Sequence, residues 1–494
     1  MVKRYAVSVV WLRRDLRLDD HVALFRAVQA SERVVCAFVL DPPLLRGPRV
    51  GAPIVQFFFD SLRVLRERLR DTGSDLALLE GDFADELLGL AQRVHAGAVF
   101  YNADYDPKAV ARDDGVARRL RDAGLDVHAS TDHVYFEADD VLQDGGKPYT
   151  VYTPYRRRWN ARFAAEPNPP VRSETAAQPN LLARDAIGAT REVPRPEEYG
   201  HASSDAYPRA GLVEAQRLLK TFLAGDATRY ADARNMPALE ATSRLSPHLR
   251  AGTIGIRTVV HAAARLRARA AKPAASNVDT WLGELVWRDF YQQILAHQPR
   301  VAHEPFVEAA QTIPYAHDTA AYAAWCEGRT GYPVVDAAMT QLNTTGWMHN
   351  RLRMIVASFL TKHLLTDYHE GERYFEQHLA DADLAANNGG WQWSSSTGTD
   401  AAPYFRVFNP TVQGKTFDPG GAFVRAMLPA LANVPSKFVH EPWTIPPLLQ
   451  IELGCVIGRD YPAPIVDHAF ARERALDVYG RALSKRAGAV KQLR

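Results

Sequence analysis

The sequence has few cysteines and no long apolar run. Only Cys36, Cys326 and Cys455 occur among its 494 residues, and none belongs to a CxxC pair. This spacing supports neither a disulfide framework nor a zinc site, so we expect no bound metal and a reducing compartment. No segment approaches the roughly 20 apolar residues that cross a bilayer, and the N-terminus lacks a signal-peptide core. We therefore expect a cytoplasmic protein with no membrane partner.

The sequence also lacks a large net charge and a dinucleotide-binding fingerprint. The formal net charge is +2, so a nucleic-acid partner would have to be bound by a local basic patch. The first apolar run is followed by Arg13, Arg14 and Asp15, where a dinucleotide-binding Rossmann domain would carry GxGxxG. An ordinary NAD(P)H-dependent flavin oxidoreductase is therefore disfavoured.

The N-terminal part carries the pattern of an α/β protein. Short apolar runs (VSVVWL, VVCAFVL, LALLEG and AVFYN) alternate with amphipathic segments such as Ile54 to Arg70 and Lys108 to Ala123. This alternation predicts a doubly wound parallel-sheet domain over residues 1–135. A Pro-rich stretch within residues 136–209 indicates a connector. Helical periodicity dominates residues 210–480, which predicts a second, all-α domain.

The most informative stretch lies near the C-terminal end. It contains GWMHNRLRM (346–354), DADLAANNGGWQW (381–393) and STGTDAAPYFRVFNP (396–410). An Asn-Asn-Gly-Gly turn beside two Trp, with charged residues interleaved, is typical of a pocket wall that approaches a flat ligand closely. We expect that ligand to be large, aromatic and anionic.

Together with four other motifs, this stretch carries a family resemblance. The others, in order, are VVWLRRDLRLDDH (9–21), YTVYTPYRRRW (149–159), TSRLSPHLRAG (242–252) and WLGELVWRDFYQQIL (281–295). Several long motifs in one order resemble the DNA photolyase and cryptochrome family, and most nearly its class I cyclobutane pyrimidine dimer photolyases.

The resemblance implies a function and its cofactors. It implies an FAD-binding helical domain and a carbon–carbon lyase that repairs cyclobutane pyrimidine dimers in DNA. Repair would proceed by light-driven electron transfer from excited reduced FAD to the flipped lesion. A second, antenna chromophore of the pterin, deazaflavin or flavin type is possible in the first domain. The partner would be UV-damaged DNA, bound by a monomer.

One helical face stands out within the fourth of these motifs. Glu284, Trp287, Arg288 and Tyr291 follow an i, i+3, i+4, i+7 spacing, which places a carboxylate, an indole and a guanidinium together. The alternative is that Trp287 is a plain core residue. The resemblance assigns Trp287 to stacking on the flipped dimer and Glu284 to its base edge.

The resemblance also implies that Arg288 and Tyr291 contact DNA. Taken singly, Arg234 and Arg351 would also fit an ordinary solvated surface. The remaining DNA contacts that the resemblance implies are Arg234, Asn350, Arg351, Met354, Arg406 and Gln413.

The phosphates of FAD need hydrogen-bond donors. Residues 242–246 offer hydroxyls and N–H groups at an expected helix start, although a plain helix cap has the same pattern. The resemblance also implies an Arg353–Asp381 ion pair beside the flavin and an amide, Asn387, facing flavin N5. The implied cofactor contacts are Tyr230, Thr242, Ser243, Arg244, Leu245, Ser246, Trp281, Glu284, Arg288, Asn350, Arg353, Asp381, Ala382, Asp383 and Asn387.

The electron-supplying tryptophan triad of the family is altered here. Its positions map onto Trp391, Tyr368 and Tyr315, so only the flavin-proximal member is Trp. Tyrosine is hard to oxidise without losing its proton. We therefore expect slower photoreduction by this route, or a path through other tryptophans: Trp325, Trp347 or Trp393.

A blue-light photoreceptor of the cryptochrome type is the alternative function. It predicts a long, low-complexity signalling tail, whereas this sequence has a short basic end after residue 483. The family's plant cryptochromes carry Asp, and its animal ones Cys, at the place of Asn387. Asn387 therefore favours a photolyase.

Overall fold

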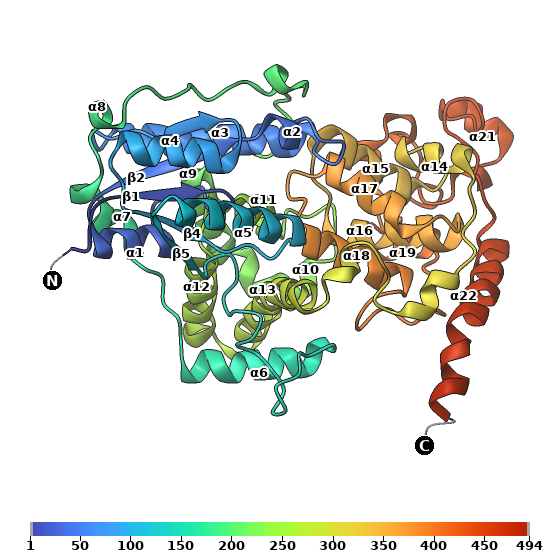
Figure 1. Ribbon diagram of the computed structural model, residues 1–494. Helices are drawn as coiled ribbons and strands as arrows, with labels where there is room; N and C mark the ends of the chain where they lie inside the picture. Colours follow the sequence, from blue (N-terminus) through green and yellow to red (C-terminus); the bar gives the residue numbers. More distant parts are fainter. Residues whose placement is uncertain (1–2, 492–494) are drawn as a thin grey trace. The chain divides into compact units, whose positions relative to one another are not determined.

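The computed structural model describes residues 3–491 (Figure 1). Its internal contacts divide the chain into two compact units. Unit 1 comprises the described residues of Met1–Tyr230, Thr242–Pro299 and Ala380–Ala385. Unit 2 comprises those of Ala231–Ala241, Arg300–Leu379 and Ala386–Arg494. The boundaries expected from sequence, at 135/136 and 209/210, stay a prediction.

Unit 1 contains a five-stranded parallel sheet in the order β3-β2-β1-β4-β5. In the central pairs, Val9 of β1 lies opposite Val35 of β2 and Val99 of β4. The order reverses between β1 and β4, as in doubly wound sheets, which confirms the predicted fold class. The strands are β1 Tyr5–Leu12, β2 Ser31–Leu40, β3 Ala77–Glu80, β4 Ala98–Asn102 and β5 Asp126–Ser130.

The other regular elements of unit 1 are helices. Two of them, α3 and α5, correspond to the amphipathic segments that the sequence pattern identified. The helices are α1 Val22–Ala30, α2 Pro42–Leu45, α3 Ala52–Arg70, α4 Phe83–Arg93, α5 Pro107–Asp122, α6 Tyr152–Ala165, α7 Ser173–Ala177, α8 Arg184–Ile187, α9 Leu212–Ala224, α11 Ser246–Ala251, α12 Ile256–Arg269 and α13 Lys272–His297.

The last strand, β5, ends at Ser130, and the regular elements described from residue 210 to residue 480 are helices, which confirms the predicted helical second domain. Two helices, α10 Tyr230–Ala233 and α18 Leu384–Ser395, begin in unit 1 and end in unit 2. Unit 2 also contains α14 Thr319–Cys326, α15 Pro333–Thr345, α16 Asn350–Ser358, the π-helix η6 Phe359–His363, α17 Tyr368–His378, α19 Pro410–Phe417, α20 Ala422–Met427, α21 Pro447–Glu452 and α22 His468–Lys491.

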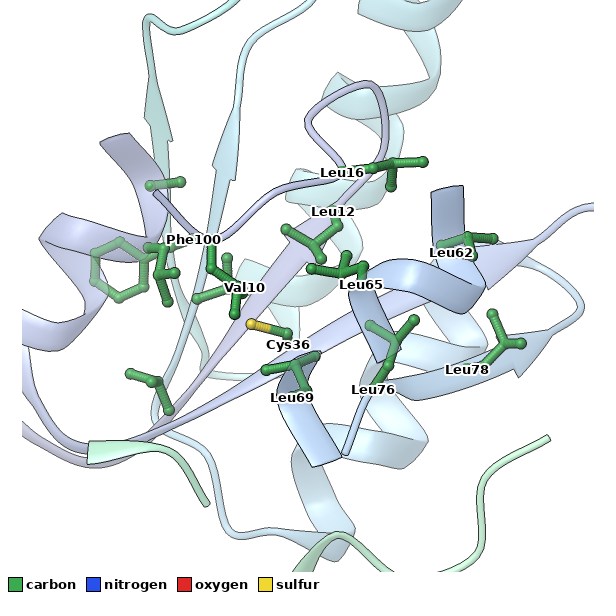
Figure 2. Packing of buried hydrophobic residues seen from close by; sticks show 14 of the residues in the cluster. Val10, Leu12, Leu16, Cys36, Leu62, Leu65, Leu69, Leu76, Leu78 and Phe100 are labelled. Atoms are coloured by element: carbon green, nitrogen blue, oxygen red, sulfur yellow. The ribbon is translucent and has the colours of Figure 1, made fainter. Parts of the chain in front are cut away.

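The sheet has an apolar core on each face because successive strand residues point to opposite sides. Val10 and Leu12 pack with residues of α1 and α3 on one face (Figure 2). Val9 and Trp11 pack with residues of α4 and α5 on the other. Burial on both faces explains why the strands are nearly continuous apolar runs.

The charged residues after β1 form buried ion pairs within unit 1. Arg257 of α12 is fully buried and contacts Asp20 at 2.8 Å and Asp132 at 2.5 Å. Arg17 contacts Asp132 at 2.6 Å. Arg13 pairs with Asp113. The opening motif therefore ties the strand ends to the helices of the same unit.

Candidate functional site

The indole of Trp287, on α13, stacks on Tyr152 of α6. Their ring centroids lie 3.6 Å apart with an interplanar angle of 8°. Tyr152 also donates its hydroxyl to Gly283 O at 2.6 Å. Both Trp287 and Glu284 are half-buried, on a helix as the sequence predicted. Tyr152 therefore occupies one face of the indole, and a base that stacks on Trp287 must use the other face or displace Tyr152.

Arg288 contacts His133. It donates to His133 O, and its Nη2 lies 2.9 and 2.8 Å from the two ring nitrogens of His133. Burial, followed by the Arg288 and Arg14 cations, lowers the pKa of His133 to about 3. The ring is therefore neutral near pH 7. The contacts of Arg288 with FAD and DNA stay predictions.

The segment 381–383 is anchored within unit 1. Arg14 forms an ion pair with Asp383, and Gln292 donates to Asp383 Oδ1 at 3.0 Å. Arg250 donates to Ala382 O at 2.6 Å. Burial alone would raise the pKa of Asp383, but Arg14 and its other partners outweigh it and hold the pKa well below its usual range. Asp383 is therefore a fixed negative charge.

Sequence reasoning did not assign a role to Arg14 or Tyr152, although both stand in motifs that carried the resemblance. Arg14 belongs to the opening RRD motif, and Tyr152 to YTVYTPYRRRW. Arg14 contacts Asp383 and Tyr152 contacts Trp287, and both of these partners were assigned a role from sequence. For Arg14 and Tyr152 themselves, the motifs were the only signal that the sequence offered.

The segment expected to bind phosphates does end in a helix, α11, which begins at Ser246. Leu245 precedes this helix and provides no side-chain cap. Arg244 adopts a left-handed backbone with φ of 54°. The hydroxyls and N–H groups of this segment are the donors that phosphate oxygens require, so the segment fits the phosphates of FAD.

Two further residues expected to contact FAD share one aromatic neighbour. The rings of Tyr230 and Trp281 both pack edge-on against Phe222, at 5.9 Å and 4.7 Å between centroids. Tyr230 and Trp281 are themselves buried. The structure therefore brings these two residues together around one ring of α9.

In unit 2, arginines expected to contact DNA lie close to one another. Arg351 donates to Asn235 Oδ1 at 2.8 Å, and its guanidinium lies 4.4 Å above the ring of Phe417. Burial, then the charges of Arg234 and Arg406, lower the pKa of Arg351. Cations that destabilise one another in this way favour an anion as a common partner.

The remaining expected DNA contacts of unit 2 lie on two helices. Gln413 precedes Phe417 by one turn of α19. Asn350 and Met354 lie one turn apart on α16, where Asn350 is exposed and Met354 half-buried. Their i, i+4 spacing places them on one helical face, as the sequence predicted.

Two residues expected to lie beside the flavin are held by backbone carbonyls in unit 2. Asn387 donates through Nδ2 to Glu372 O at 3.0 Å. Arg353 donates through Nε to Met348 O at 2.9 Å. The amide keeps a second Nδ2–H and its Oδ1, so it can still donate or accept a further hydrogen bond.

The three positions of the electron-supplying triad are in unit 2. Trp391 is 2% exposed, and α17 approaches it so closely that a Cβ at Gly371 would lie 2.1 Å from Cη2 of the indole. Tyr368 is buried at the start of α17. Tyr315 packs in an apolar cluster with Tyr479. Their role in electron transfer stays a prediction.

No helix in the described residues 3–491 is both long and apolar enough to traverse a bilayer. Within the same residues, no group of three or more His, Cys, Asp or Glu could hold a metal ion.

Two family profiles match the chain. One, described as "DNA photolyase", matches residues 8–174, and the other, "FAD binding domain of DNA photolyase", matches residues 281–481.

Curated relatives match it over nearly its full length. The "Deoxyribodipyrimidine photo-lyase" of Halobacterium salinarum is 42% identical, with 96% of this chain and 99% of that protein covered. The protein of the same name in Escherichia coli is 39% identical, with 95% and 98% covered.

Solved structures are similar as well. A class III photolyase of Agrobacterium tumefaciens superposes with a TM-score of 0.88 at 35% identity, covering 98% of both chains. An archaeal photolyase of Sulfolobus tokodaii with two FAD molecules gives 0.80 at 29% identity, covering 96% of this chain and all of that one. A cryptochrome of Synechocystis gives 0.85 at 26% identity, with 96% and 99% covered.

Proposed function

Because the chain belongs to the DNA photolyase family, we propose that it is a deoxyribodipyrimidine photo-lyase that repairs cyclobutane pyrimidine dimers in DNA under light. The observation that carries this proposal is the near full-length match to relatives of that name at 35–42% identity. The match favours a repair enzyme over a photoreceptor of the cryptochrome type. A monomeric, cytoplasmic enzyme is part of the proposal.

FAD is the resident cofactor, and the residues present fit it. When bound, FAD supplies the electron that light makes available for the lesion. Thr242 and Ser243 hold its phosphates through their hydroxyls. Asn387 would face N5 of the flavin, where its amide can accept or donate a hydrogen bond. A second, antenna chromophore of the pterin, deazaflavin or flavin type belongs to the same proposal.

The lesion is held by stacking and by phosphate contacts. Trp287 stacks on the flipped dimer, while Glu284 and Asn350 hydrogen-bond its base edges and Met354 packs beside it. A hydrogen bond to the dimer stabilises it after it has gained an electron, and this is the state in which the cyclobutane bonds open. The flanking phosphates are bound by arginines of unit 2: Arg234, Arg351 and Arg406.

Replacing Trp287 with alanine is expected to weaken binding of dimer-containing DNA by about 1–3 kcal/mol, the usual contribution of stacking a base on an aromatic ring. FAD content and the melting temperature should stay near those of the parent. Titration of a fluorescent dimer-containing oligonucleotide in the dark measures the effect, with undamaged DNA as the control. Loss of FAD or of the fold instead would show that Trp287 is a core residue.

Replacing Arg351 with alanine is expected to reduce the salt dependence of DNA binding. One lost phosphate contact lowers the slope of log K against log salt by about 0.9. Arg329→Ala is the matched control, because Arg329 is an exposed arginine of unit 2 whose recorded partner is Glu327. If the slope of the Arg351 variant equalled the slopes of the parent and of the Arg329 control, Arg351 would not belong to the DNA interface.

Three measurements in the dark test the proposal as a whole. The absorption spectrum of the purified protein should show bound flavin, and the protein should bind an oligonucleotide with one thymine dimer more tightly than the undamaged sequence. Sedimentation should give a monomer. Bound flavin without any preference for the lesion would favour a photoreceptor.

A further inference from the structure

Trp391 has two aromatic neighbours among the described residues. Phe375 lies at 5.0 Å between ring centroids, and Trp325 of α14 lies at 6.1 Å with an interplanar angle of 70°. Phenylalanine is too hard to oxidise to carry a hole. Because electron tunnelling weakens steeply with distance, the ring of Trp325 is the favoured next site after Trp391.

A further ring, that of Tyr374, connects Trp325 to the protein surface. It is completely buried and donates Nε1–H to Val356 O at 3.1 Å. Its indole contacts Tyr374 at 5.5 Å, 65° between planes. Tyr374 is only half-buried, and its hydroxyl donates to Asn343 Oδ1 at 2.7 Å on the exposed side. All three of Trp391, Trp325 and Tyr374 belong to unit 2.

Tyr368, the second position of the family's triad, is less suited to carry the hole. Its ring is 1% exposed and stacks on His369 at 4.0 Å. Among residues 3–491 its hydroxyl has no hydrogen-bond partner. A phenol that has no acceptor for its proton is a poor electron donor.

We propose that the electrons that reduce the flavin in this protein travel through Trp391, Trp325 and Tyr374, and bypass Tyr368 and Tyr315. Trp391 gives one electron to the light-excited oxidised flavin and takes one back from Trp325. Trp325 in turn takes one electron from Tyr374, whose phenolic proton leaves to solvent beside the exposed Asn343. A thiol reductant in solution returns one electron and one proton to Tyr374. The route rests on the proposed FAD binding.

Transient absorption of the FAD-loaded, full-length protein tests the route. Trp325→Phe should lose most of its photoreduction in the presence of a thiol, whereas Tyr368→Phe should photoreduce like the parent. Tyr368→Phe is a matched control because it removes one oxygen and keeps the ring. Parent-like photoreduction in Trp325→Phe, or its loss in Tyr368→Phe, would overturn the proposal.

A second variant tests the end of the route and disturbs the packing little. Tyr374→Phe keeps the ring and removes the ionisable hydroxyl. The neutral tyrosyl radical that the route predicts for the parent, measured by transient absorption and electron paramagnetic resonance, should be absent, and the hole should remain on tryptophan. Tyr322→Phe is its control, because the ring of Tyr322 also contacts Trp325, at 6.1 Å between centroids. A tyrosyl radical that persists in Tyr374→Phe would contradict the assignment of Tyr374.

Failure of this route and failure of the proposed function give different results. Each variant is also reduced chemically with dithionite and assayed for dimer repair. Parent-like repair by reduced Trp325→Phe, together with lost photoreduction, supports the route. A parent protein that binds FAD and repairs dimers, with photoreduction unchanged in Trp325→Phe, overturns the route alone.

Discussion

Arg257→Met is expected to lower the free energy of unfolding by about 3–5 kcal/mol, because it removes the arginine that pairs with the buried Asp20 and one of the two arginines that pair with the buried Asp132. Arg257 is fully buried and contacts Asp20 and Asp132 at 2.8 Å and 2.5 Å. The methionine fills much of the same volume but neutralises neither charge. Chemical denaturation followed by circular dichroism measures the loss.

The loss of stability in Arg257→Met should become smaller as the pH falls. Burial alone would raise the pKa of Asp132, but Arg17 and Arg257 outweigh it and hold the pKa below its usual range. The stability that Asp132 contributes is therefore present above the unfolded-state pKa of about 3.9 and is lost as pH falls through the lower folded-state pKa. The difference between parent and variant should narrow below about pH 4.

Arg265→Met is the matched control, since Arg265 is an exposed arginine on the same helix. It should change stability by no more than about 0.5 kcal/mol. Equal effects of the two substitutions, or an Arg257→Met effect that does not vary with pH, would contradict the buried ion-pair network.

Gly371→Ala is expected to displace Trp391 and to destabilise the protein by about 1–3 kcal/mol through overpacking. The added Cβ would lie 2.1 Å from Cη2 of Trp391 and 2.7 Å from Cδ2 of Leu360. Photoreduction should fall as well, because Trp391 is the proposed first donor to the flavin. Thermal unfolding and photoreduction rates measure the two effects.

Gly390→Ala is the control for Gly371→Ala. Gly390 lies on α18 next to Trp391, is exposed, and has no atom within 4 Å of an added Cβ. A helical Gly→Ala change at an open position should be neutral or stabilising by about 0.5–1 kcal/mol. If both glycine variants behaved alike, the close approach of α17 to Trp391 would be wrong.

Much of the fold could be predicted because it is encoded locally. The segments expected at 54–70 and 108–123 are α3 and α5, within two residues at each end. Strands buried on both faces are continuous apolar runs, which made the sheet recognisable. Its order could not be predicted, because the pairing of β1 with both β2 and β4 depends on contacts between distant residues.

The candidate site was predictable to the extent that family motifs cover it. The helix carrying Trp287 was expected, whereas the stacking of Tyr152 was not, because the two residues are far apart in sequence. The Arg14–Asp383 ion pair joins positions separated by 369 residues. Motif positions also mapped Tyr368 onto the triad, but only ring contacts show that Trp325 adjoins Trp391.

Light-dependent repair by the purified protein tests the central claim most directly. The FAD-loaded protein is reduced chemically, mixed with an oligonucleotide that carries one thymine dimer, and exposed to near-ultraviolet or blue light. Chromatography should show the dimer converted to two thymines, with no conversion in the dark. If the reduced, FAD-loaded protein leaves the dimer intact under light, it is not a deoxyribodipyrimidine photo-lyase.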